Sequence, residues 1–169
     1  MRRSHIKPLV MFSIFILISC AGPKSEEDQI RALMREAGKY AENKDVIGLM
    51  SFFSDDYADF RRRDKRQTQA MVQNYISLYR GIIVHMLSTR FEELGHLDAS
   101  IHTDIAVSSG AAKALRKLIP ISTDIFRFRI ELIKQDDRWL IQYAEWKPIG
   151  LEELFPESLS ILKQIFPDE

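Results

Sequence analysis

The hydrophobic pattern of the chain changes its period once, near Gly81. Before this glycine, apolar residues recur every three to four positions, which is the spacing of amphipathic helices. After it, apolar and polar residues alternate, as they do in strands with one buried face. Helices followed by a run of strands predict an α+β fold, in which N-terminal helices pack on one face of a mainly antiparallel sheet.

The local signals divide the chain into helices and strands. Ser25, Asp45 and Asp64 each precede a helical stretch and are typical N-cap residues. A turn at Asp136 and Asp137 separates the two strands of the clearest hairpin. We expect strands over Tyr57–Arg62, Val84–Leu94, Ser100–Ser108, Ser122–Lys134 and Arg138–Pro148, and a C-terminal tail of two short helical pieces split by Pro156.

Length and composition favour one globular domain. The chain has 169 residues, of which 46% are apolar, and its 24 basic residues balance 24 acidic ones. Residues 1–19 carry a charge of +3, so the remainder carries −3 and offers no broad basic surface for nucleic acid. The single cysteine excludes an intramolecular disulfide.

The N-terminal segment has the features of a secretory signal. A cationic stretch is followed by an apolar run over residues 9–18, which is short for a membrane span. The sequence then reads Leu17-Ile-Ser-Cys20, which resembles the lipobox of bacterial lipoproteins. The alternative is an uncleaved membrane anchor.

The lipobox resemblance implies that residues 1–19 are a signal peptide, that Cys20 is lipidated and that residues 20–25 form a short tether. The membrane, through the lipid on Cys20, would then be a partner. We therefore expect a lipid-anchored protein of the bacterial cell envelope, on the periplasmic face of the outer membrane if the organism has two membranes.

Two segments resemble the NTF2-like (SnoaL-like) cone fold. Residues 40–57 end in Asp-Asp-Tyr, which is similar to the step from the second helix into the first strand of that family. Residues 137–146 are similar to its last strand. The resemblance covers residues 26–148 and leaves 149–169 as a tail. It implies a curved sheet around a cone-shaped cavity, in a family that includes both enzymes and non-catalytic binding modules.

The hairpin predicts which side chains face the helices. A two-residue turn at Asp136-Asp137 pairs Phe128 with Glu145 and Ile130 with Tyr143, so these four share the apolar face. In an NTF2-like cone that face is also the cavity side. The opposite face carries Arg127, Arg129 and Trp146, and the same pairing places Arg127 opposite Trp146. We expect this face to be the interface if the chain forms a homodimer.

The pocket is predicted to hold a few polar groups among apolar walls. Its expected members are Tyr57, Tyr79, Phe128, Ile130, Tyr143 and Glu145. Glu145 and Asp59 are the candidate catalytic carboxylates, because burial raises a carboxyl pKa toward the range of a general acid or base. The alternative for Glu145 is a solvated position at the cone rim.

Other motifs add little chemistry. The histidines lack metal-ligand spacing, and no cofactor or phosphate-binding motif occurs, so we expect neither metal nor cofactor. His85 is in phase to point inward and His102 outward. The basic run over residues 61–66 fits either contact with anionic lipid or a solvated corner between strand and helix.

These patterns together predict a lipid-anchored envelope protein. Its domain would be a non-catalytic module that binds a small apolar ligand or a protein partner. The alternative function is a SnoaL-like enzyme (isomerase, dehydratase or hydrolase type) that uses a cavity carboxylate.

Overall fold

The computed structural model describes residues 25–109 and 123–154 of the chain. The predicted signal peptide, Cys20 and most of the C-terminal tail lie outside the described residues, as does the connection 110–122. The elements in chain order are α1 (Glu26–Glu42), α2 (Val46–Met50), β1 (Phe53–Asp59), α3 (Lys65–Ser77), β2 (Ile82–Leu94), β3 (Asp98–Ser109), β4 (Thr123–Gln135), β5 (Arg138–Pro148) and α4 (Leu151–Leu154).

The three N-terminal helices begin at the predicted caps. The Ser25 side chain accepts a hydrogen bond from the backbone of Asp28 at the start of α1, and Asp45 does the same for α2. At the start of α3, Asp64 and Gln67 form a reciprocal capping box. These caps satisfy amide groups that the first turn of a helix leaves without partners.

The strands form one sheet in the order β1-β5-β4-β3-β2. Strand β1 runs parallel to β5, and every other neighbouring pair is antiparallel. The β4–β5 hairpin turns at Asp136 and Asp137, which both have positive φ, 47° and 58°. Two such residues in succession are typical of the tight turn that suits twisted strands.

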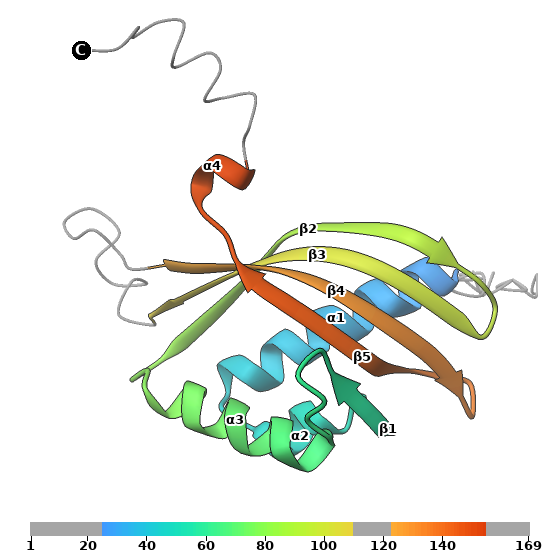
Figure 1. Cartoon of the computed structure of the whole chain (residues 1–169), viewed down its shortest axis with the longest axis horizontal. Coiled ribbons are helices and arrows are strands. Elements are labelled where there is room, and N and C mark those ends of the chain that lie inside the picture. Colours follow the sequence, from blue (N-terminus) through green and yellow to red (C-terminus); the bar gives the residue numbers. More distant parts are fainter. Residues whose placement is uncertain (1–24, 110–122, 155–169) are drawn as a thin grey trace, which may run out of the picture.

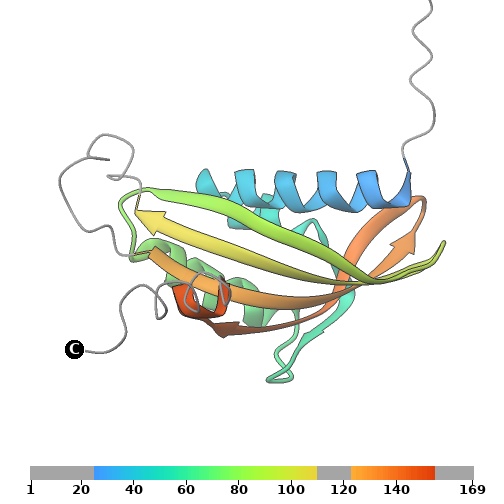
Figure 2. The same ribbon diagram turned by 90° about the horizontal axis from the view of Figure 1, so that it is seen from above.

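Helices α1, α2 and α3 cover one face of the curved sheet, while α4 lies against the other face (Figure 1). Helix α1 runs along the β2 side of the sheet (Figure 2). Between helices and sheet lies a core whose most buried members include Ile30, Ile101 and Leu132. The predicted α+β cone, with helices packed on a curved and mainly antiparallel sheet, is confirmed.

The first strand differs most from its predicted bounds, and the other strands differ by at most two residues at their ends. The first strand spans Phe53–Asp59 instead of Tyr57–Arg62, because the chain leaves the sheet at Asp59 and turns. Arg62 has a positive φ of 61° in this turn, which ends the extended backbone. In the tail, α4 provides the first helical piece, and the second piece lies outside the described residues. Among the described helices, none has the length and apolar character required to span a bilayer.

Candidate functional site

A cavity of about 290 Å³ lies between the helices and the concave face of the sheet. This volume is close to the lower end of the range of about 300–1,000 Å³ for small-molecule sites. Helices α1, α2 and α3 and all five strands contribute to its walls. The walls are mainly methionine, aromatic and aliphatic side chains, among them Met34, Met71, Met86, Phe126, Phe128 and Trp146.

Three lining residues carry a hydroxyl group: Tyr57, Thr68 and Tyr75. In the described part of the chain, no Asp, Glu, Lys, Arg, His or Cys lines the cavity. An apolar wall without charge disfavours an ionised ligand, because burying an unpaired charge costs much free energy. The cavity is therefore suited to an uncharged, mainly apolar molecule.

Thr68 is the most unusual polar group in the wall. Its side chain is 2% exposed, and its Oγ1 has no hydrogen-bond partner among the described residues. Tyr57 is its neighbour and is also buried. Burial raises the pKa of Tyr57 to about 12, and a contact with the Thr68 hydroxyl, too weak to meet the geometry of a hydrogen bond, opposes this in part. Like an ordinary tyrosine, Tyr57 is neutral at physiological pH and can donate a hydrogen bond.

Tyr75 belongs to a polar cluster farther along α3. The Tyr79 hydroxyl lies 2.6 Å from Oδ2 of Asp124, and the Tyr75 hydroxyl lies 3.2 Å from the same oxygen. Burial raises the pKa of both tyrosines, and the contact with Asp124 adds to the effect. Tyr79 was predicted to line the pocket, but it is not among the lining residues. It contacts Tyr75 and Asp124 instead.

The predicted register of the β4–β5 hairpin is correct only near the turn. Leu132 pairs with Ile141 as predicted, but a register shift follows, and Arg129 pairs with Glu145 and Glu131 with Tyr143. The extra residue on β5 is Gln142, which is the position of a β-bulge. A one-residue shift moves the following side chains to the other face.

The bulge corrects the faces that were predicted for the outer half of β5. Ala144 and Trp146 line the cavity, whereas Tyr143 and Glu145 do not. The Tyr143 hydroxyl donates to Glu145 at 3.0 Å, away from the cavity wall. The placement of Tyr143 and Glu145 in the pocket is thus wrong, as is the placement of Trp146 on the outer face. Phe128, Ile130 and Tyr57 do line the cavity.

Asp59, the second candidate carboxylate, serves the turn after β1. Its side chain is fully buried, and one oxygen accepts backbone N–H groups of Arg61 at 2.8 Å and Arg63 at 2.9 Å. The other oxygen lies 2.6 Å from Nε of Arg63. Asp59 is absent from the cavity wall, and the Arg63 guanidinium also lies over the ring of Trp146.

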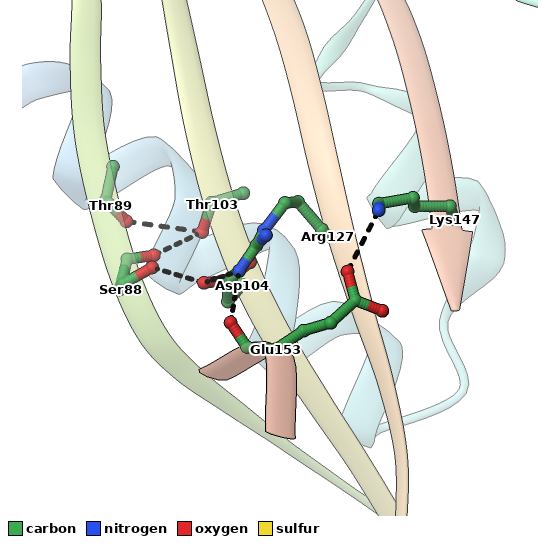
Figure 3. A network of polar contacts seen from close by, with 7 residues as sticks. All are labelled: Ser88, Thr89, Thr103, Asp104, Arg127, Lys147 and Glu153. Carbon is green, nitrogen blue, oxygen red and sulfur yellow. Dashed lines mark hydrogen bonds and ion pairs between the residues drawn. The ribbon is translucent and has the colours of Figure 1, made fainter. Parts of the chain in front are cut away.

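The outer face holds a polar network that sequence reasoning assigned differently. Arg127 pairs with Lys147 across the hairpin, not with Trp146. Its guanidinium binds Asp104 at 2.8 Å and the carbonyl of Glu153 in α4 at 3.3 Å (Figure 3). Burial acts to raise the pKa of Asp104, but hydrogen bonds from Arg127 and Ser88 outweigh it and hold the pKa below its usual value.

Helix α4 occupies part of the face that was predicted to be a dimer interface. Leu154 packs on a cluster of Ala106, Ile125 and Ile149 on this face. Arg129, farther along β4, bridges to Glu131 at 3.1 Å. The homodimer itself stays a prediction.

The histidines take outer or exposed positions. His85 is exposed, between the cavity-lining residues Val84 and Met86, so its predicted inward direction is wrong. His102 lies 3.3 Å from Glu92. Within residues 25–109 and 123–154, no group of His, Cys, Asp and Glu side chains is arranged to hold a metal ion.

The wall residues that sequence reasoning did not assign to the pocket include Thr68 and Trp146. Thr68 is four residues before Val72 and seven before Tyr75, which places all three on one helix face. That spacing could have identified it. For Trp146, the signal is the apolar pattern of β5, which moves from odd positions to even ones after Ile141.

Comparisons with known proteins support the fold. No protein-family model and no curated protein matches the sequence. Among solved structures, the chain is similar to an NTF2-like protein of unknown function from Pseudomonas putida. That match has a TM-score of 0.60 at 15% identity and covers 78% of this chain and 94% of the other.

Two further structures have the same architecture. One, from Novosphingobium aromaticivorans, is provisionally named a scytalone dehydratase; the TM-score is 0.62 at 14% identity, over 74% of this chain and 85% of the other. The other is the protein Aln2 from a Streptomyces species, with a TM-score of 0.63 at 10% identity, over 81% of this chain and 99% of the other. The fold is thus that of the NTF2-like cone.

Proposed function

We propose that this protein is a lipid-anchored component of the bacterial cell envelope whose cone binds a small apolar ligand without transforming it. The observation that carries the proposal is the cavity of about 290 Å³, whose described wall contains no charged side chain. Each CH₂ group that moves from water into such a cavity contributes about 0.8 kcal/mol. A medium-sized apolar molecule thus gains enough free energy to remain bound.

Binding has more support than catalysis. An enzyme of the SnoaL-like type would need a carboxylate or another proton-transferring group beside the ligand. Neither Asp59 nor Glu145 lines the cavity. Asp59 is committed to Arg61 and Arg63, and Glu145 accepts from Tyr143. The neutral hydroxyls of Tyr57 and Thr68 can orient a ligand, which a binding module also requires.

The proposed anchor would hold the cavity near a membrane. Only four residues separate Cys20 from Ser25, the residue that caps α1. A chain of this length spans at most about 18 Å when fully extended. A ligand that partitions into membranes would therefore be concentrated close to the site.

A fluorescence titration with N-phenyl-1-naphthylamine, a neutral apolar probe, tests the binding function. The Ala37→Leu/Ala144→Leu double variant adds apolar volume from two wall positions and should weaken binding at least about tenfold. Ala70→Leu is the matched control, because Ala70 lies on α3 but is exposed. Equal probe affinity in the wild type and the double variant would contradict the proposal.

Metabolic labelling with a radioactive fatty acid tests the anchor separately. The wild-type chain, expressed in a bacterium, should incorporate label and partition with membranes. Cys20→Ser should abolish the incorporation. Label that persists in Cys20→Ser, or a wild-type chain without label, would exclude lipidation at this cysteine.

A further inference from the structure

The cavity wall contains a hydroxyl group that has no hydrogen-bond partner in the described part of the chain. Thr68 Oγ1 is buried in the wall and makes no hydrogen bond within the described residues. A buried hydroxyl without a partner costs about 1–3 kcal/mol, so such groups are uncommon in stable cores. We infer that the ligand is an uncharged amphiphile whose hydroxyl or carbonyl group pairs with Thr68 and Tyr57. The inference rests on the proposed binding function and names its ligand class.

The location of Thr68 in the cavity wall distinguishes it from Ser54, whose buried hydroxyl also has no partner among the described residues. Ser54 does not line the cavity. Thr68 does, and it lies next to a second hydroxyl, that of Tyr57. Tyr57 is neutral at physiological pH, and burial raises its pKa further above that range. The pair therefore offers both donors and acceptors to a polar group of the ligand.

Charge at this end of the cavity is already neutralised. Arg63, which lies over the ring of the lining residue Trp146, is paired with the buried Asp59. An anionic ligand would find no free cation in the described wall, and a cationic one would find no carboxylate. A carboxylate or ammonium group would therefore enter without compensation, whereas a hydroxyl or carbonyl needs only a hydrogen bond.

The direction of α3 fixes how the rest of the ligand lies. Tyr75 is seven residues beyond Thr68, or about 10 Å along the helix axis. Its hydroxyl is occupied by Tyr79 and Asp124. Between these positions the wall is apolar, with Met71 and Val72 on α3. The ligand thus places its polar group near Thr68 and its hydrocarbon part along α3.

Competition against N-phenyl-1-naphthylamine with three probes of similar length tests this inference. The probes are 1-decanol, undecane and decanoate at pH 8, applied to residues 21–169, which include every described residue. Undecane matches 1-decanol in length but cannot form a hydrogen bond. Thr68→Val removes the hydroxyl and keeps nearly the same side-chain shape, whereas Thr68→Ser keeps the hydroxyl. Thr103→Val is the control, because Thr103 is a buried threonine outside the cavity.

In the wild type, 1-decanol should bind at least about tenfold more tightly than decanoate. Thr68→Val should weaken the binding of 1-decanol about three- to tenfold, as expected for the loss of one hydrogen bond. The affinity for undecane should change less than about twofold. Thr68→Ser should recover most of the loss, and Thr103→Val should change neither ligand. An equal effect of Thr68→Val on 1-decanol and undecane would overturn the inference, as would decanoate binding as tightly as 1-decanol. If even undecane fails to displace the probe, the binding function falls as well.

Discussion

Replacing Thr68 by valine should stabilise the ligand-free protein, which is unusual for a substitution at a buried polar residue. Valine has nearly the shape of threonine, and it replaces a hydroxyl that has no hydrogen-bond partner in the described structure. Removing this uncompensated group should raise the free energy of unfolding by about 1 kcal/mol. For a chain of this size, that gain raises the melting temperature by about 2–4 °C.

The same substitution at Thr103 should have the opposite sign. Thr103 is 1% exposed, and its hydroxyl donates to the carbonyl of Ser88 at 2.7 Å, in the network on strands β2 and β3 (Figure 3). Thr103→Val removes this bond and should lower the free energy of unfolding by about 1 kcal/mol.

Urea unfolding followed by circular dichroism measures both variants on delipidated protein, because bound ligand would stabilise the wild type selectively. The two variants should differ by about 2 kcal/mol. If Thr68→Val is as destabilising as Thr103→Val, the Thr68 hydroxyl is paired in solution, and the reasoning about the cavity is refuted.

Three further outcomes are expected. Asp59→Asn should lower the free energy of unfolding by about 3 kcal/mol, because it leaves Arg63 without its buried ion-pair partner; a urea midpoint equal to that of the wild type would contradict the structural role of Asp59. Burial raises the pKa of Tyr57 from about 10 in the unfolded chain to about 12, so its contribution is intact below pH 10 and is lost as the pH rises toward 12. Between pH 10 and pH 12, the free energy of unfolding should therefore fall less steeply with pH in Tyr57→Phe than in the wild type. An equally steep fall in the two proteins would argue against the burial of this hydroxyl. Glu145→Gln should leave probe affinity close to that of the wild type, because Glu145 lies outside the cavity wall. A loss of affinity of about tenfold, or about 1.4 kcal/mol, would show that Glu145 contacts the ligand.

Local signals were sufficient to predict the architecture. The caps at Ser25, Asp45 and Asp64 and the turn at Asp136 and Asp137 depend on interactions within a few residues, so the sequence displays them directly. The change of hydrophobic period at Gly81 separates the helices from the antiparallel strands. These features determine the order of the elements and which layer each belongs to.

The site was predicted less well because it depends on a single extra residue. Counting from the turn gives the correct pairs as far as Leu132 and Ile141, and the bulge at Gln142 then exchanges the two faces of β5. The exchange replaces Glu145 by Trp146 in the cavity wall. The shifted register favours the fold because it places the Trp146 ring in the apolar wall and keeps the Glu145 carboxylate out of it.

Other features depend on the shape of a turn or on tertiary contacts, which local patterns do not display. The sequence shows that Asp59 is acidic, but its commitment to Arg63 becomes visible only when the turn after β1 is formed. Likewise, Arg127 binds Asp104 and α4, although the sequence alone suggested Trp146 as its neighbour. Spacing can nominate such residues, whereas their partners come from the fold.

Native mass spectrometry of residues 21–169, exported from a bacterium and purified without detergent, tests the central claim most directly. A cone that binds an uncharged apolar ligand predicts a reproducible added mass in the wild type and in Ala70→Leu. The added mass should be absent from Ala37→Leu/Ala144→Leu, and its chemical identification should yield a neutral molecule with a hydroxyl or carbonyl group. A bare chain in the wild type, together with no binding of added 1-decanol or undecane, would contradict the account.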